Sequence, residues 1–248
     1  MDQTAQKRWA ELAERAFSRC CYTYTEFLSL AEQDSLSRFP LGKNAAPLHF
    51  WGGFPEAERK LACFGSPELC GYEEEPPLCY IEIKARQARF AEQLSHRDFL
   101  GALLSLGLRR SLLGDILIYE NRGYLICFAH MGSFILEQLQ QVRRTSVFCS
   151  LVDVLPDVSL LLPEPQGFQV ASERLDALLA AVYHLSRSES QLLVSRGRAA
   201  VNDRECLSGD TLLQQGDRVS LRGYGRFLYE GAVGSTRKGR LRVSARVF

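Results

Sequence analysis

Apolar residues recur at helical spacing in two stretches near the start of the chain. In residues 4–19, charged side chains occupy the face opposite the apolar positions Trp9, Leu12, Ala13, Ala16 and Phe17. This pattern predicts an amphipathic helix. Residues 25–39 predict a second helix, which the following Pro and Gly terminate. Short apolar runs at 48–51 and 61–64 predict two strands, joined through the glycine-containing sequence GGFPEAER.

Strand and helix patterns alternate after the acidic, proline-containing stretch at 73–77, which we interpret as a domain boundary. The expected elements are, in order, a strand at 78–85, a helix at 97–108, strands at 115–120 and 123–129, a helix at 131–141 and a strand at 147–153. This β-α-β-β-α-β order is that of a ferredoxin-like split unit and of the commonest fold that binds single-stranded RNA. The order favours RNA binding but is not diagnostic of it.

The apolar pattern is densest in the last third of the chain. A first helix is predicted after Ser172; Arg174 and Asp176 lie outside its apolar stripe, which consists of Leu175, Leu178, Leu179, Val182 and Leu185. The spacing Ser186-x-x-Glu189 is a capping box and predicts the start of a second helix. A turn rich in Arg and Gly ends that helix. Strands are then predicted at 200–201, 218–222, 226–233 and 241–247.

Prolines between residues 156 and 165 predict a partly extended linker. The sequence therefore predicts an α+β protein in four parts. These are a small N-terminal α/β domain at 1–75, a ferredoxin-like or RRM-like middle domain at 76–155, the linker at 156–170 and a C-terminal domain at 171–248.

Charge divides the chain into an acidic part and a basic part. Residues 1–170 contain 17 Lys and Arg against 21 Asp and Glu, whereas residues 171–248 contain 13 against 8. The net charge of +1 for the whole chain therefore hides a basic C-terminal module. This asymmetry predicts a polyanionic partner for that module alone.

Composition and cysteine usage predict a cytoplasmic globular protein. With 46% hydrophobic and 24% charged residues, the chain can bury several cores. It contains no run of about 18 apolar residues, and charges occur throughout its start, so we expect no membrane segment and no signal peptide. The eight cysteines form no CxxC pair and most lie in apolar runs, which favours reduced thiols over a metal site.

Residues 1–155 carry no recognisable catalytic or cofactor-binding motif. The Gly52-Gly53 turn lacks the Lys-Ser/Thr of a phosphate-binding loop, which favours a structural turn. The sequence HRD at 96–98 lacks the Asn of a kinase catalytic loop, since Leu103 stands at that position. We therefore predict no catalytic residue, no metal and no cofactor.

Two features of the middle domain have alternative interpretations. The sequence RGY at 122–124 matches the start of an RNA-stacking strand, but Ile126 and Ala129 stand where further aromatic residues are needed, so Tyr124 and Phe128 are expected in the core. His96 and Asp98 are expected to cap a helix whose end suits Arg109 and Arg110. The alternative is a small basic patch formed by His96, Arg97, Arg109 and Arg110.

The sequence ERLDALLAAVYHLSRSESQLLVSRGRAAVN at 173–202, with GDRVSLRG after it, resembles the S-four-type RNA-binding domain, or αL motif, named for the small-subunit ribosomal protein in which it occurs. Matches outside this domain extend the resemblance to nearly the whole chain. GGFPEAER, HRDFLGALLSLGLRR, RGYGRF and TRKGR are similar to the bacterial YlmH family. One departure lies in the usual G-x-V-x-V-N turn, where this chain has GRAAVN at 197–202, and we expect Ala200 to weaken strand packing there.

This resemblance implies a ribosome-associated RNA-binding protein. Members of the YlmH family are linked to the rescue of stalled large subunits that carry peptidyl-tRNA, and by gene neighbourhood to cell division; cyanobacterial and plastid relatives carry a photosystem label. The RNA contacts that the resemblance implies are Arg174, Ser186, Arg187, Arg196, Arg198 and Asn202. Charge geometry adds Arg222, Arg226, Arg237, Lys238 and Arg240.

We therefore expect a non-enzymatic monomer that binds structured rRNA or tRNA on the large ribosomal subunit and acts in ribosome-associated quality control. One alternative is an RNA-modifying enzyme or its accessory, because the same domain is appended to pseudouridine synthases. Another is a protein-interaction platform formed by the acidic residues 1–155, in cell division or photosystem assembly.

Overall fold

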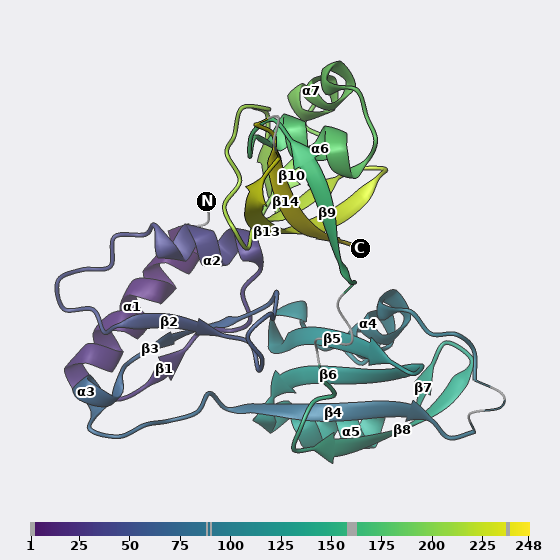
Figure 1. Ribbon diagram of the computed structural model, residues 1–248. Helices are drawn as coiled ribbons and strands as arrows, with labels where there is room; N and C mark the ends of the chain where they lie inside the picture. The colour runs from purple at the N-terminus through teal and green to yellow at the C-terminus, as the bar shows by residue number, and fades with distance from the viewer. Residues whose placement is uncertain (1–2, 88, 90, 158–162, 237–238) are drawn as a thin grey trace. The chain divides into compact units, whose positions relative to one another are not determined.

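The computed structural model describes residues 3–87, 89, 91–157, 163–236 and 239–248. The fold is mixed α+β, as the sequence predicts, and the described residues form three antiparallel sheets (Figure 1). The chain divides into two compact units, Met1–Leu161 and Leu162–Phe248. Among the described residues, no helix is both long enough and apolar enough to cross a membrane.

The first sheet has the strand order β1-β3-β2, formed by Thr23–Tyr24, Leu61–Phe64 and Leu48–Trp51. Helix α1 (Gln3–Arg19) packs its apolar stripe, which includes Trp9 and Leu12, into a core shared with β3. Helices α2 (Leu30–Ser37) and α3 (Pro67–Cys70) complete this part. The helix predicted at 4–19 and both predicted strands are confirmed.

The second predicted helix begins later than its apolar pattern indicates. Helix α2 starts at residue 30, because Ser29 and Glu32 form a capping box there. The preceding residues are used in strand pairing instead: β1 pairs with β3, and Leu28 forms an isolated bridge with Lys60. Pairing with a distant segment therefore overrides the helical periodicity at 25–29.

The second sheet has the strand order β5-β6-β4-β8-β7. Its elements are β4 (Leu78–Ala85), α4 (His96–Ser105), β5 (Leu113–Tyr119), β6 (Arg122–Phe128), α5 (Gly132–Gln138), β7 (Gln141–Val142) and β8 (Thr145–Val152). They follow the predicted β-α-β-β-α-β order, with the short strand β7 added. Both helices contribute to one core on one face of the sheet, where Phe99 of α4 and Ile135 of α5 join Ile81 and Leu125.

The other face of this sheet is covered in part by GGFPEAER. Side chains alternate between the faces of a strand, and on this face Ile126 and Phe128 of β6 share a core with Phe54 and Ala57. The Asp115 carboxylate accepts hydrogen bonds from the backbone N–H groups of Glu58 (2.6 Å) and Arg59 (3.2 Å). The Tyr80 hydroxyl donates to the Gly53 carbonyl at 3.0 Å. GGFPEAER thus connects the first sheet to the second by apolar packing and hydrogen bonds, as expected for a structural turn.

The third sheet lies in the C-terminal unit and has the strand order β11-β10-β12-β13-β14-β9. Its strands are β9 (Pro165–Val170), β10 (Ala199–Val201), β11 (Arg204–Cys206), β12 (Arg218–Leu221), β13 (Gly225–Ser235) and β14 (Leu241–Val247), and its helices are α6 (Leu175–Val182) and α7 (Arg187–Ser195). The two predicted helices and the later strands are confirmed. Residues 165–170 are an exception, because the sequence places them in the linker whereas they pair with β14. Pro165 is compatible with that strand because it occupies the first position of an edge strand.

Gly123 of β6 is a packing position. A Cβ atom there would lie 2.8 Å from Cε1 of Phe99, whose side chain is fully buried. We expect Gly123→Ala to lower the free energy of unfolding by about 1–3 kcal/mol, the usual cost of overpacking a core. Chemical denaturation measures this change. Gly101→Ala on the exposed side of α4 is the matched control, because its methyl group would meet no atom within 4 Å; equal stabilities of the two variants would contradict the prediction.

Candidate nucleic-acid interface

Two predicted arginines converge on a buried carboxylate between α6 and α7. Asp176 has no solvent exposure. Its oxygens accept hydrogen bonds from Arg174 (2.8 and 3.1 Å), Arg187 (both 3.4 Å) and Gln191 (2.8 Å). The expectation that Asp176 lies outside the buried face of α6 is therefore wrong. The physical reason is that donors from α6 and α7 together compensate the loss of water around the carboxylate.

This arrangement keeps Asp176 ionised. Burial raises the pKa of its carboxyl group, but hydrogen bonds from Arg174, Gln191 and Arg187 outweigh burial and lower the pKa to about 2. The Arg174 side chain is 30% exposed and the Arg187 side chain 48%, and Arg174 also pairs with Asp210. Both arginines join the two helices and keep part of their surface in water. A charge reversal at Arg187 would place a second carboxylate beside Asp176, so it would test folding as well as RNA binding.

A hollow on the third sheet brings three other predicted arginines together. Arg198, Arg222 and Arg226 line this hollow of about 740 Å³, which also contains Phe248. One Nη of Arg198 donates to the Arg222 carbonyl at 2.8 Å, and the Arg226 guanidinium lies 5.1 Å from the centroid of the Phe248 ring. Asp203 and Glu205 line the hollow as well. Three guanidinium groups near two carboxylates leave a positive balance that suits a phosphate.

The turn that carries Arg198 depends on a glycine. Gly197 has a φ of +68°, and a Cβ atom there would lie 2.6 Å from a carboxylate oxygen of Glu205. The left-handed conformation favours glycine, and a Cβ atom at this position would also require the Glu205 side chain to move. Arg196 is the C-cap of α7 and is exposed, but it does not line the hollow. The two arginines of this turn therefore lie in different surroundings: Arg198 lines the hollow and Arg196 does not.

Two polar residues of the predicted set make contacts within the fold. The Ser186 hydroxyl caps α7 by accepting from the Glu189 N–H at 3.2 Å. Asn202 and Asp203 both have positive φ and form the two-residue turn between β10 and β11. The Asn202 amide donates to Asp217 at 2.8 Å and accepts from the Arg218 N–H at 2.9 Å. RNA contact by Ser186 and Asn202 stays a prediction.

The basic hairpin tip is separate from the hollow. Arg240 is exposed in the turn after β13, whereas Arg226 lies near the start of that strand. At about 3.3 Å per residue, the two ends of β13 are roughly 30 Å apart. Arg237 and Lys238 lie outside the described residues. Apart from Arg196, the described arginines of the predicted set therefore occupy three separate places. Arg174 and Arg187 bond to Asp176; Arg198, Arg222 and Arg226 line the hollow; and Arg240 lies at the hairpin tip.

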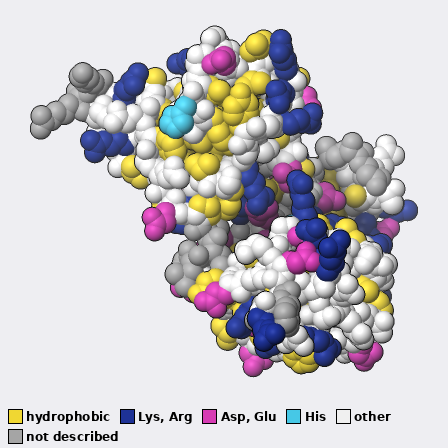
Figure 2. Space-filling model, turned by 90° about the vertical axis from the view of Figure 1, so that its right-hand side faces the viewer, with side chains coloured by type: hydrophobic (Ala, Val, Ile, Leu, Met, Phe, Trp, Pro, Cys, Tyr) yellow, Lys and Arg dark blue, Asp and Glu magenta, His cyan; other side chains and the backbone are white. Residues whose placement is uncertain are grey.

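Two exposed aromatic residues beside these arginines are absent from the predicted set. Phe248 is 40% exposed in the hollow, and Tyr224, 46% exposed, packs 5.7 Å from the ring of Tyr183. Aromatic rings beside arginines are a common way to bind RNA bases. The sequence RGYGRF contains that combination for Tyr224. On the face of the C-terminal unit drawn in Figure 2, Lys and Arg side chains lie around a hydrophobic area.

The second sheet supports RNA binding less than the C-terminal unit does, because the aromatic residues and arginines considered there are engaged within the fold. Tyr124 and Phe128 are buried, as predicted, and the Tyr124 hydroxyl bonds to Glu82 at 3.2 Å. Arg109 pairs with Glu26 at 2.5 Å. Arg110 donates to the backbone carbonyls of residues 113 and 114 at 2.7 and 2.8 Å. Two of the four members of the alternative basic patch are therefore engaged within the fold.

Comparisons with known proteins support the family resemblance. Residues 73–154 match the family described as "Putative RNA-binding domain in YlmH". The ribosome-associated protein quality control protein P2 of Bacillus subtilis is 34% identical over 227 residues, which cover 89% of this chain and 85% of the relative. The solved structure of the cell division protein YlmH from Streptococcus pneumoniae has 19% identity and a TM-score of 0.48, covering 61% of this chain and 90% of that one. By the identity and coverage of the Bacillus relative, this chain belongs to the YlmH family.

Proposed function

We propose that this protein is a non-enzymatic RNA-binding factor that acts in ribosome-associated quality control on the large ribosomal subunit. The name of the Bacillus relative supports the process, and the description of the matched family supports RNA as the ligand. The observation that carries the proposal is the grouping of Arg198, Arg222 and Arg226 in one hollow of the basic C-terminal unit. In this proposal the protein is located in the cytoplasm and acts as a monomer.

The order of strands and helices supports the proposed division of the chain into domains. The strand order β5-β6-β4-β8 supports a ferredoxin-like, RRM-like domain at 76–155, and the helix pair followed by the β10–β11 hairpin supports an S-four-type domain at 171–248. Residues 1–75 form the N-terminal domain of this scheme. The linker at 156–170 is shortened by β9, which pairs within the C-terminal sheet.

The arginine hollow suits the backbone of structured RNA. An RNA helix exposes phosphates and 2′-hydroxyls along its shallow minor groove, and these groups are contacted without reading base edges. Arg222 and Arg226 are exposed, and Arg198 is held by a backbone carbonyl. Guanidinium groups so positioned can bind phosphates while Phe248 accepts the face of a base or sugar.

The RNA affinity of the full-length protein should fall steeply with salt. If about five phosphates are neutralised, the plot of log K against log salt concentration has a slope of roughly −3 to −5, because bound counterions are released. Fluorescence anisotropy with a labelled hairpin of large-subunit rRNA, at several potassium chloride concentrations, measures this slope. An affinity independent of salt would contradict the proposal.

Two further measurements test the rival functions. Mass spectrometry of nucleosides after incubation of RNA with the protein should detect no new modification; any modification that requires the protein would identify an enzyme.

The full-length protein should sediment with purified large subunits. Sedimentation that survives charge reversal of Arg198 and Arg222 would favour an interaction platform in residues 1–155.

A further inference from the structure

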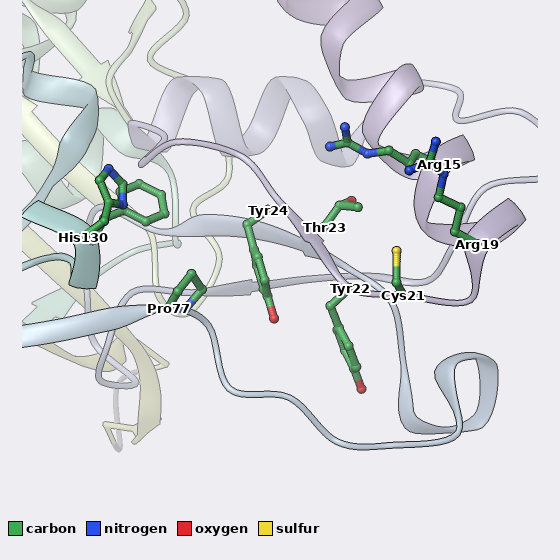
Figure 3. A pocket seen from close by; sticks show the side chains of 9 residues that line it. Arg15, Arg19, Cys21, Tyr22, Thr23, Tyr24, Pro77 and His130 are labelled. Carbon is green, nitrogen blue, oxygen red and sulfur yellow. The ribbon is translucent and has the colours of Figure 1, made fainter.

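A second hollow lies wholly within residues 1–161, between the end of α1, strand β1 and the end of β6. Arg15, Arg19, Tyr22, Tyr24 and His130 are among its lining residues (Figure 3). Its volume is about 450 Å³, within the range of about 300–1,000 Å³ that is usual for sites that hold small molecules. The predicted set of RNA contacts includes no residue of this hollow.

The cationic side of the hollow consists of two arginines one turn apart on α1. Arg15 and Arg19 are both exposed, and neither forms an ion pair with any residue that the structure describes. Like charges four residues apart on a helix repel each other, and an anion bound between them would remove that repulsion. Residues 1–170 are acidic overall, so this concentration of positive charge is local and not a property of the whole surface.

The aromatic side of the hollow consists of the rings of Tyr22, Tyr24 and His130. Tyr24 belongs to β1 and Tyr22 directly precedes it. In Figure 3 both lie between the two arginines and His130. The Tyr22 hydroxyl donates to the Tyr72 carbonyl at 3.2 Å, and the Tyr24 hydroxyl donates to Glu74 at 2.8 Å. Each hydroxyl is bound at the far end of its ring, which restricts the movement of both rings. The His130 ring packs 5.5 Å from Phe128.

The charges at the two ends of the hollow also orient a ligand. Glu74 at the Tyr24 hydroxyl, with Glu68 and Glu73 near Tyr22, would repel a phosphate. Arg15 and Arg19 would attract one. A nucleotide satisfies both ends, since its phosphate and its base are separate groups. Arginines next to aromatic rings form the combination that binds single-stranded nucleic acid by charge and stacking.

We propose that this hollow is a second RNA site, which holds one nucleotide of a single-stranded segment. The phosphate lies between Arg15 and Arg19, and the base contacts Tyr24 and His130. The choice of RNA as the polyanion rests on the proposed function, but the site itself shares no residue with the C-terminal hollow. Since the two sites lie on units joined by a linker, one RNA that reaches both is held more tightly than either site alone can hold it.

Charge reversal on α1 tests this site in the full-length protein. Arg15→Glu with Arg19→Glu should weaken the binding of a ten-nucleotide single-stranded RNA of mixed sequence by about 10-fold. Lys7→Glu with Arg8→Glu is the matched control, because these residues are exposed on the same helix, change the charge equally and do not line the hollow. The control should change affinity by less than about 2-fold. Equal losses in both variants, or no loss in the first, would overturn the proposal.

Cys21, which lines the hollow, provides a local readout. In a Cys20→Ser background, the oligonucleotide should slow alkylation of Cys21 by iodoacetamide, measured by mass spectrometry of the peptide. The protection should persist when Arg198 and Arg222 are reversed and disappear when Arg15 and Arg19 are reversed. When Arg198 and Arg222 are intact, adenosine monophosphate at the same nucleotide concentration should protect Cys21 less than the oligonucleotide does, because the mononucleotide cannot occupy both hollows at once. Equal protection there would overturn the assignment to RNA.

The same variants separate this inference from the proposed function. Suppose that RNA binding is normal in the Arg15/Arg19 variant and is lost in the Arg198/Arg222 variant. This result would contradict the second site and support the C-terminal hollow as the RNA interface. The opposite pattern would support the second site and overturn the C-terminal hollow as the RNA interface.

Discussion

Reversal of Arg198 and Arg222 together should weaken binding of a structured RNA hairpin by about 100-fold. The loss of stability should stay below about 1 kcal/mol, because the lost hydrogen bond of Arg198 and the repulsion from Asp203 and Glu205 both lie at the surface. Both side chains line the C-terminal hollow, and Arg198 donates a hydrogen bond to the backbone carbonyl of Arg222. Each substitution replaces an attraction to phosphate by a repulsion. The Kd at fixed salt concentration measures the loss, and the salt slope should fall by about 2 because two phosphate contacts disappear.

Lys7→Glu with Arg8→Glu controls for net charge in this experiment too. The change in total charge is the same, but the substituted residues are exposed on α1, outside the C-terminal unit. Similar losses in both double variants would mean that only net charge matters. Unchanged affinity in the Arg198/Arg222 variant would move the interface to the hairpin tip that contains Arg240.

Asp176→Ala should lower the free energy of unfolding by about 2–4 kcal/mol. Removal of one member of a buried ionic network usually costs about 3–5 kcal/mol. The cost is smaller here because Arg174 and Arg187 are partly exposed and regain water. Chemical denaturation measures the difference. Asp210→Ala is the matched control: this carboxylate also pairs with Arg174 but is 73% exposed, so its loss should cost less than about 1 kcal/mol. Equal costs would refute a special role for the buried carboxylate.

The same carboxylate should make the protein sensitive to acid. The pKa of Asp176 is about 2 in the folded protein, below its value of about 3.9 in an unfolded chain. A lowered folded-state pKa means that the stabilisation is fully present above about pH 4 and is lost as the pH falls through about 2. Asp176→Ala should therefore lose less stability than the natural sequence between pH 4 and 2. Identical losses over that window would contradict this assignment.

Local patterns in the sequence were sufficient for most elements of the C-terminal unit. The capping box of Ser186 and Glu189 is confirmed, because a helix cap depends on neighbouring residues. Residues 25–29 and 165–170 were predicted wrongly. Both stretches are positioned by strands distant in the sequence, which local periodicity does not report.

The candidate site shows the same division. The resemblance and the local charge pattern identify arginines as the groups that bind RNA, but not which of them act together. Arg198, Arg222 and Arg226 belong to three segments, and the pairing of β10 with β12 and of β12 with β13 brings those segments side by side. Arg174 and Arg187 are arginines of the same predicted set, but their side chains pair with the buried carboxylate of Asp176 and do not line the hollow.

The sequence by itself therefore determined the α+β class, the β-α-β-β-α-β order at 78–153, the basic character of residues 171–248 and the family to which the chain belongs. These properties depend on composition and on residues close together in the chain. Only the tertiary structure decided that Asp176 is buried, that GGFPEAER fastens two sheets, and that Arg15 and Arg19 lie beside tyrosines and a histidine. Each of these depends on burial or on contacts between distant segments, which arise when the chain packs.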